Sequence, residues 1–362
     1  MQKIIILIFC SLFALQLSAA DYRVLLLGDI HYDHLKYHTS AEGKIISRYS
    51  KVHVTMWQKK QPSALFTAAA RQLDKDVPFV LQLGDFIEGC GATPDLRAQM
   101  MRDGFNAVKS HFPNHKLLAV KGNHDIRCDV DITVNGKVKK SNGKDNETYK
   151  KNFLPLLAKE LGHQEINSNY SVLHNNDLYI FYDNFIYRKS SFNFLRKTLA
   201  AYPNVRKIFF ITHIPVLPCS TYQPGALLSN HAEIAKLLAS RNAIILAAHT
   251  HQISLVKVKI GSNTLTQFVS SSIGRFWNRG KKFETLAKNK DEFYSKFTGR
   301  FVNAPKTLDA KKYLDSLNIE EFTLYNAQVQ GFCVMKVSDS GSVEIEFYNN
   351  DSNQPALVKK LH

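Results

Sequence analysis

The stretch Tyr22-Arg-Val-Leu-Leu-Leu-Gly-Asp-Ile-His31 decides the fold, because an apolar run ends there abruptly in polar side chains. The same arrangement occurs at five places along the chain. The other four apolar runs are residues 79–84 before Asp85, 116–120 before Gly122-Asn-His-Asp125, 208–211 before Thr212-His213, and 243–248 before His249-Thr-His251. Such near-continuous apolar runs are typical of strands that are buried on both faces.

Helical patterns lie between these predicted strands. Thr93-Pro94 can begin a helix over residues 95–109, and Ser229 can cap a helix over 230–240. Residues 63–73 and 192–201 have similar patterns. Strands that alternate with helices predict βαβ units, and ligands bind at the carboxyl ends of the strands in such sheets. All five polar clusters follow the carboxyl end of a predicted strand.

Two hairpins complete the predicted architecture. One joins residues 170–173 to 178–182, and the other joins 331–337 to 342–348. The order of elements predicts an α/β fold in which two mixed β-sheets pack as a sandwich flanked by helices, an αββα arrangement. Residues 129–146 are polar and rich in Lys, and we expect them to form a surface loop. The predicted division is a signal peptide at 1–20, a catalytic core at 21–275, an appended basic helical segment at 276–320, and a C-terminal hairpin at 321–362 that completes the core.

The first twenty residues predict export. Lys3 precedes an apolar run of about twelve residues, which is short of the roughly 20 needed to span a bilayer. Ser18 and Ala20 supply the small residues of a cleavage site, so the mature chain is expected to begin at Asp21. The expected location is periplasmic or extracellular, and an uncleaved membrane anchor is the alternative.

The chain is strongly basic, with a formal net charge of +16. Such a field concentrates anions, which include phosphate substrates, nucleic acid and acidic membrane surfaces. The basic residues 275–312 are interleaved with aromatic side chains and could bind an anionic polymer or lipid head groups. The interpretation that we favour is an amphipathic helix with its aromatic side chains in the core. No obligate protein partner is inferred.

Seven side chains at the five strand ends form a candidate metal site. Carboxylate, amide and imidazole groups are ligands for divalent metals that activate water, and a two-metal site needs a bridging carboxylate. The simpler alternative, that each residue only caps a strand or helix end, becomes improbable for so many residues at equivalent edges. The candidate ligands are Asp29, His31, Asp85, Asn123, His213, His249 and His251.

In this ordered set the chain resembles the calcineurin-like metallophosphoesterases. The family pattern is D-x-H, G-D, G-N-H-D or G-N-H-E, a lone His, and G-H-x-H, and the resemblance covers about residues 21–273. It implies a two-sheet αββα fold and a dinuclear metal centre with Zn, Mn or Fe. Ala248 departs from the family's usual Gly. Glu88 stands where purple acid phosphatases have a metal-binding Tyr, which places the chain outside that subgroup.

The resemblance also implies a role for each site residue. The first metal would be bound by Asp29, His31 and His251, and the second by Asn123, His213 and His249, while Asp85 would bridge them. His124 would contact the phosphoryl group or protonate the leaving group. Asp125 is expected to orient His124, by analogy with the carboxylate partners of catalytic histidines.

Two cysteines lie close in sequence to the predicted site residues. Cys90 follows the Asp85 loop and Cys128 follows the Asn123 loop, and the two loops must meet at bridged metals. We therefore predict a disulfide between Cys90 and Cys128, with Cys219 as the alternative partner.

The predicted function is that of an exported hydrolase of phosphate monoesters or diesters. The attacking group would be a hydroxide held between two metal ions, and His124 would assist the leaving group. The alternative is a non-catalytic binding module on the same fold.

Overall fold

Strand β1 (Tyr22–Leu27) shows how the sequence builds the layers. Its side chains alternate between two separate cores, as expected for a strand covered on both faces. Val24 and Leu26 pack in the core between the two sheets. Leu25 and Leu27 pack on the other face, against a layer of helices. The first apolar run is therefore buried on both sides, as predicted.

The computed structural model describes the chain from Ala20 to His362 with several gaps. The described residues are 20–73, 77–134, 137–186, 188–221, 223, 225–228, 230–273, 284–297, 305–327, 329–349 and 354–362. The predicted signal peptide thus lies outside them, apart from Ala20. Ser229, the predicted helix cap, also lies outside them. Among the described helices, none combines the length and apolar character that a membrane span requires.

The described strands form two large sheets and one small one. One sheet has the order β16-β15-β14-β1-β2-β3 and the other has the order β12-β13-β10-β11-β9-β8-β7-β6. In the first sheet β1, β2 and β3 are parallel, and in the second β7, β8, β9 and β11 are parallel. The bounds are β2 Phe79–Gln82, β3 Lys116–Ala119, β6 Tyr170–His174, β7 Asp177–Tyr182, β8 Lys207–Thr212, β9 Ile244–Ala247, β10 Ile253–Ile260, β11 Asn263–Val269, β12 Glu284–Ala287, β13 Ile319–Ala327, β14 Phe332–Val337, β15 Val343–Tyr348 and β16 Leu357–Lys360.

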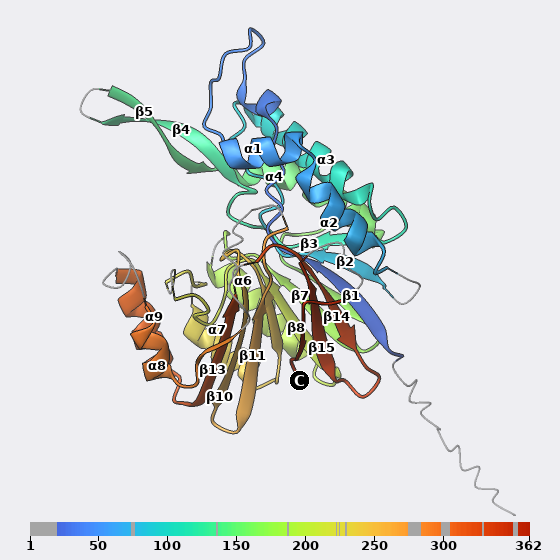
Figure 1. Ribbon diagram of the computed structural model, residues 1–362, viewed down its shortest axis with the longest axis vertical. Coiled ribbons are helices and arrows are strands. Elements are labelled where there is room, and N and C mark those ends of the chain that lie inside the picture. Colours follow the sequence, from blue (N-terminus) through green and yellow to red (C-terminus); the bar gives the residue numbers. More distant parts are fainter. Residues whose placement is uncertain are drawn as a thin grey trace, which may run out of the picture.

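Helices cover the outer face of each sheet, which confirms the predicted αββα arrangement (Figure 1). Those on the six-stranded sheet are α1 Lys51–Gln58, α2 Gln61–Ala70, α3 Pro94–Lys109, α4 Asn146–Asn152 and α5 Leu154–Leu161. Those on the eight-stranded sheet are α6 Arg188–Ala201, α7 His231–Ala239, α8 Lys290–Ser295 and α9 Pro305–Ser316. A short 3-10 helix, η1 (Leu35–His38), follows β1.

Local signals predicted several elements correctly. Thr93 caps α3 by accepting a hydrogen bond from the Leu96 amide, and Pro94 occupies the first turn. The two predicted hairpins are β6–β7 and β14–β15. Strand β14 also pairs with β1, so the second hairpin extends the six-stranded sheet.

The prediction of a surface loop at 129–146 is wrong. The structure forms a two-stranded hairpin there, with β4 at Arg127–Val134 and β5 at Lys137–Lys144. Among the described strands these two pair only with each other, and they extend away from the body of the molecule (Figure 1). The first strand does alternate apolar residues at 128, 130, 132 and 134 with polar ones, which is a strand signal that the prediction overlooked, whereas the second strand shows no such alternation.

The basic region near the C-terminus contributes a strand and two helices in its described parts, β12, α8 and α9. Phe293 and Phe297 of this region are buried in the core of the eight-stranded sheet. This supports the favoured interpretation, in which the aromatic side chains pack inward. Phe276, Trp277, Phe283 and Phe301 lie outside the described residues.

The predicted disulfide is contradicted by the structure. Cys90, Cys128, Cys219 and Cys333 are all free and buried. Their loops do meet, because the Cys90 amide donates a hydrogen bond to the Arg127 carbonyl at 2.8 Å. Burial raises the pKa of the Cys90 thiol to about 12, which keeps it protonated.

Candidate metal centre

The predicted ligands lie on loops that follow strands of both large sheets. Those after β1, β2 and β3 come from the six-stranded sheet, and those after β8 and β9 come from the eight-stranded sheet. The main-chain amides of Ile30 and His31 both donate to the Asp85 carbonyl at 3.0 Å, which joins the first two loops. The Ala248 amide donates to the His213 carbonyl at 3.1 Å and joins the last two.

One group of ligand atoms gathers around the Nε2 atom of His213. This atom lies 3.1 Å from Asp85 Oδ2, 3.1 Å from Asn123 Oδ1 and 3.1 Å from His249 Nδ1. His213 Nδ1 donates to the Leu83 carbonyl at 2.9 Å, so in the neutral ring Nε2 is the nitrogen with a free lone pair. The grouping matches the set that the resemblance implies for the second metal.

A second group lies beside it and contains Asp29, His31 and His251. His31 Nε2 is 3.3 Å from His251 Nε2, and His251 Nε2 is 3.7 Å from Asp29 Oδ1. His31 Nε2 is also 3.9 Å from Asp85 Oδ2. The same carboxylate oxygen therefore faces both groups, which is the arrangement that a bridging ligand requires.

Several candidate ligands adopt a left-handed backbone. The φ angles are 49° at His31, 53° at Asp85, 71° at His249 and 54° at His251. Non-glycine residues rarely adopt this conformation, and such strain clusters at functional sites. These left-handed conformations therefore cost folding stability, and they direct the side chains into the site.

Glycines allow the close packing of the site. A Cβ atom on Gly122 would lie 2.0 Å from the Asp85 amide nitrogen, and one on Gly84 would lie 2.5 Å from His213 Nδ1. Ala248, which stands where the family usually has Gly, creates no such conflict. Ala248 is buried and is not among the positive-φ residues, so its methyl group needs no special backbone.

The electrostatics of the site suit a cation. Burial raises the pKa of Asp29 to about 7. Burial and neighbouring histidines lower the pKa of His31 to about 4 and that of His249 to about 3, which leaves both neutral. Although burial opposes it, attraction to Asp85 raises the pKa of His213 to about 9, so without a cation this ring carries a proton that a bound metal would displace. Neutral imidazoles with free lone pairs are the form that binds metals.

The residues fit a pair of metal ions. Oδ1 of Asp29 is fully buried and accepts no hydrogen bond from the described residues, although it points toward His251 and His213. A buried carboxylate oxygen without a partner is costly, and a bound cation would remove that cost. The donors are oxygen and nitrogen atoms without thiolate, a set compatible with Zn, Mn or Fe.

His124 lies at the rim of the site and is only partly buried. Its Nδ1 donates to the Glu88 carbonyl at 2.9 Å, and because a carbonyl only accepts, the proton is on Nδ1 in the neutral ring. The ring packs edge-on against His31 with 4.6 Å between centroids. Although burial opposes it, attraction to Asp85 and Glu88 raises the pKa of His124 to about 9.

The prediction that Asp125 orients the His124 ring does not match the structure, in which both carboxylate oxygens of Asp125 accept backbone amides. Its Oδ2 accepts the Gly122 amide at 2.7 Å and its Oδ1 accepts the Ile87 amide at 3.0 Å. Asp125 therefore holds the two metal-site loops together through their backbones. The carboxylate beside the His124 ring is Glu88, whose Oε2 lies 3.3 Å from His124 Nδ1.

Glu88 and His53 are site residues that the sequence did not reveal as such. Glu88 Oε2 lies 2.9 Å from His31 Nδ1 and 2.6 Å from His53 Nδ1, and Arg127 lies 3.3 Å from Oε1. The surrounding histidines hold the pKa of Glu88 well below its usual range despite its burial. The only sequence signal was the position of Glu88 three residues after Asp85; nothing marked His53 in α1.

Replacing Glu88 with Gln is expected to weaken metal binding about 10–100-fold, because this carboxylate orients the His31 ring and makes it more basic. Competition with a chromophoric chelator measures that affinity directly. Glu147→Gln, at an exposed site in α4, is the matched control and should bind metal as the unaltered protein does. Equal affinity in all three proteins would contradict the role of Glu88.

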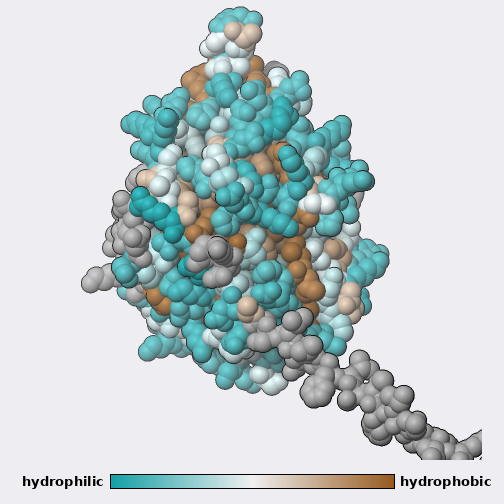
Figure 2. Space-filling model, turned by 90° about the vertical axis from the view of Figure 1, so that its right-hand side faces the viewer, coloured by the Kyte–Doolittle hydropathy of each residue, from teal (hydrophilic) through white to brown (hydrophobic). Residues whose placement is uncertain are grey.

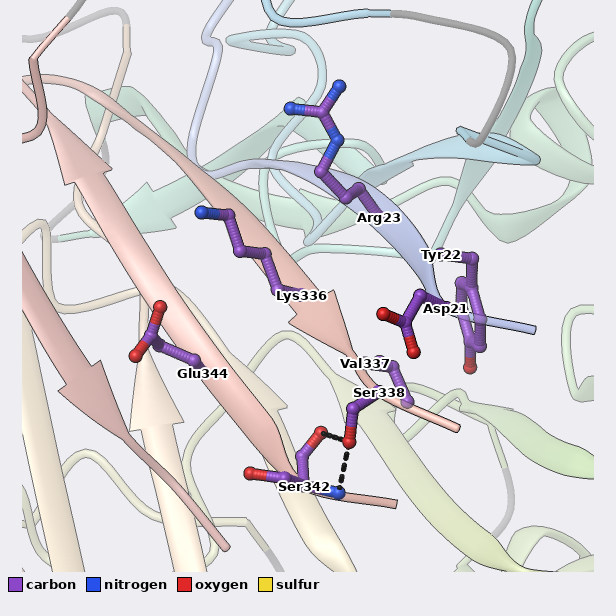
Figure 3. A pocket seen from close by; sticks show the side chains of 8 residues that line it. All are labelled: Asp21, Tyr22, Arg23, Lys336, Val337, Ser338, Ser342 and Glu344. Atoms are coloured by element: carbon purple, nitrogen blue, oxygen red, sulfur yellow. Dashed lines mark hydrogen bonds between the residues drawn. The ribbon is translucent and has the colours of Figure 1, made fainter. Parts of the chain in front are cut away.

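A pocket of about 400 Å³ lies at the other end of β1, where the strand begins, and is remote from these ligands. Figure 3 shows Arg23 and Lys336 extending from neighbouring strands toward the same side of it. The two residues are cross-strand partners in the β1–β14 pairing, and Lys336 forms an ion pair with Glu346. We assign this pocket no chemistry.

Comparison with known families agrees with the geometry. The family model for calcineurin-like phosphoesterases matches residues 22–253, which is more than half of the chain. The chain belongs to this family. This membership supports a metal-dependent hydrolase that acts on phosphate ester bonds. No curated protein sequence matched it.

Solved structures share the fold of the phosphoesterase at low sequence identity. A dimetal phosphatase from Danio rerio has 12% identity and a TM-score of 0.50, over 94% of this chain and 99% of that one. A purple acid phosphatase from yellow lupin (Lupinus luteus) seeds also has 12% identity and a TM-score of 0.50, over 94% of this chain. The phosphoesterase spans about half, 53%, of the length of that plant enzyme.

Proposed function

We propose that the protein is an exported phosphoesterase with a dinuclear metal centre, which hydrolyses phosphate monoesters or diesters. The observation that carries the proposal is the position of Asp85 Oδ2, 3.1 Å from His213 Nε2 in one ligand group and 3.9 Å from His31 Nε2 in the other. Asp29, His31 and His251 would hold one ion, and Asn123, His213 and His249 the other. When bound, two such ions supply an activated water and positive charge toward the phosphoryl oxygens.

The protein's own groups would position the ester and move one proton. His124 is held by its Nδ1 hydrogen bond, which leaves Nε2 as the nitrogen that can carry a proton to the leaving oxygen. The proximity of Asp85 and Glu88 favours the protonated form of His124, as a general acid requires. Asp125 supports the loops and takes no part in the proton transfer in this proposal.

Export is proposed from the sequence pattern of the first twenty residues, with cleavage before Asp21. The site is compatible with this proposal because its donors include no thiolate, so its ligands do not need a reducing compartment.

The test combines metal analysis with a substrate panel. The mature protein should contain about two metal ions per chain and should hydrolyse aryl phosphate monoesters or diesters when Mn, Zn or Fe is supplied. Comparison of monoesters, diesters, nucleotides and phospholipids then defines the substrate class. A protein that binds no metal and hydrolyses none of these would support the alternative, a non-catalytic binding module.

A further inference from the structure

An exposed apolar cluster lies on the segment between η1 and α1 and on the first turn of α1. Ile45 is 53% exposed, Ile46 45%, Tyr49 37% and Val52 56%. Seven large hydrophobic side chains are this exposed in the described part of the chain, and four of them fall within eight consecutive residues. Isolated exposed apolar residues are normal, whereas a contiguous cluster indicates an interaction surface. We name residues 39–52, which include the first two residues of α1, the apolar loop.

The tip of the apolar loop has a defined backbone. Thr39 and Ile45 form an antiparallel bridge. The Ser40 amide donates to the Lys44 carbonyl at 2.7 Å, and the Gly43 amide donates to the Ser40 carbonyl at 3.0 Å. Gly43 has a φ of 79°, a conformation that favours glycine. The turn thus holds Ile45 and Ile46 outward.

A buried polar chain anchors the base of the apolar loop. His38 Nε2 lies 2.7 Å from Asp33 Oδ1, and His38 Nδ1 lies 2.9 Å from Ser47 Oγ, with all three side chains buried. On the other side, Arg48 forms an ion pair with Asp129 and donates to the Ser141 carbonyl at 2.9 Å. These buried hydrogen bonds fix the geometry of the base, although Asp33 Oδ2 has no hydrogen-bond partner among the described residues. The exposure of the isoleucines is therefore built into the fold.

The loop projects as a convex feature. Figure 1 shows the segment between β1 and α1 rising at the top of the molecule, and Figure 2 shows a knob there whose outer end is mainly hydrophilic, with hydrophobic atoms beside its base. Next to it, Lys51, Val52, Thr55, Met56 and Gln61 line a hollow of about 370 Å³. A projecting knob suits insertion into a soft surface better than the enclosure of a ligand.

The charges around the knob indicate which surface it meets. Lys44, Lys51, Lys59 and Lys60 are exposed, and none of them has an ion pair in the described structure. Glu42 is the only carboxylate within residues 39–61. Apolar side chains surrounded by cations match a membrane whose interior is apolar and whose head groups are anionic.

We propose that the apolar loop inserts into an anionic phospholipid surface. The proposal goes beyond the hydrolytic function, since binding does not require catalysis. Helix α1 links the two features: Val52 faces outward, while the adjacent His53 contacts Glu88 in the metal centre. Docking through this loop would therefore hold the metal centre next to the lipid surface.

The test is co-sedimentation of the full mature chain with vesicles. The unaltered protein is expected to bind phosphatidylcholine vesicles that contain phosphatidylserine, and to bind pure phosphatidylcholine more weakly. Ile45→Ser with Ile46→Ser should weaken binding about 100-fold, because two aliphatic side chains no longer enter the lipid. Leu308→Ser with Val358→Ser is the matched control, since these side chains are 47% and 46% exposed on other elements, and it should bind as the unaltered protein does.

Three outcomes would overturn the proposal. They are the absence of vesicle binding by the unaltered protein, equal binding by the loop variant, and an equal loss in the control variant. Sedimentation velocity tests whether the apolar loop instead joins copies of the chain. A loop variant that changes only the oligomeric state would assign the surface to contacts between copies. Hydrolysis of a soluble aryl phosphate should be the same in all variants, which shows that the folded site is intact.

Discussion

Asp85→Asn is expected to abolish hydrolysis, with a loss of at least about 10³-fold, and to remove most of the bound metal. The substitution keeps the shape of the side chain but removes the charge that faces both ligand groups. Asp85 Oδ2 lies 3.1 Å from His213 Nε2, and Oδ1 accepts the His124 amide at 2.7 Å. Metal content by mass spectrometry and initial rates on an aryl phosphate measure the two effects.

The control for this variant is Asp309→Asn, at an exposed position of α9. It should keep both metal and activity. Thermal unfolding of each protein in the presence of a chelator shows whether the Asp85 variant still folds. A folded Asp85→Asn protein with full metal content and normal rates would exclude Asp85 as the bridging ligand.

His124→Ala should lower turnover about 10²–10⁴-fold while the metal stays bound. His124 is placed as the proton donor and lies outside both proposed ligand sets, and its Nδ1 is engaged by the Glu88 carbonyl. The loss should be smaller for esters whose leaving group is already a stable anion, since these need little protonation. Rates on a series of aryl esters with different leaving groups, together with metal analysis, measure both properties.

The matched control is His163→Ala, because His163 is exposed after α5. This variant should be indistinguishable from the unaltered protein. If His124→Ala loses as much metal as Asp85→Asn, then His124 is a metal ligand and the proposed separation of roles is wrong.

The sequence predicted the layers and the grouping of the candidate ligands because both depend on local patterns. An apolar run such as residues 22–27 has the signature of a doubly buried strand, and its polar end marks the edge of a sheet. The position of Asp29 relative to His251 then follows from strand order, although 222 residues separate the two in the chain.

Other features could not be predicted because they depend on packing between distant segments. His53 comes from α1, and nothing in its sequence surroundings indicates that it meets Glu88 at 2.6 Å. The prediction that Asp125 orients His124 followed an analogy with the carboxylate partners of catalytic histidines. The backbone amides of Gly122 and Ile87 occupy both oxygens of Asp125 in place of the His124 ring, and this can be seen only in the folded structure. In the hairpin at 127–144 only the first strand alternates apolar and polar residues, and the second strand, residues 137–144, has no hydrophobic period from which its pairing could be recognised.

The pairing of β1 with β14 has a consequence for the order in which the chain can fold during synthesis. Leu25 pairs with Val334, so one edge of β1 stays open until more than three hundred further residues have been made. The partner strand on the other edge, β2, is complete by Gln82. During elongation β1 is therefore an unpaired apolar edge, the kind of segment that recruits strands from other chains. We expect a holding chaperone to be needed until the last hairpin emerges, and a ribosome-bound chain stalled before residue 332 to aggregate more than the finished protein.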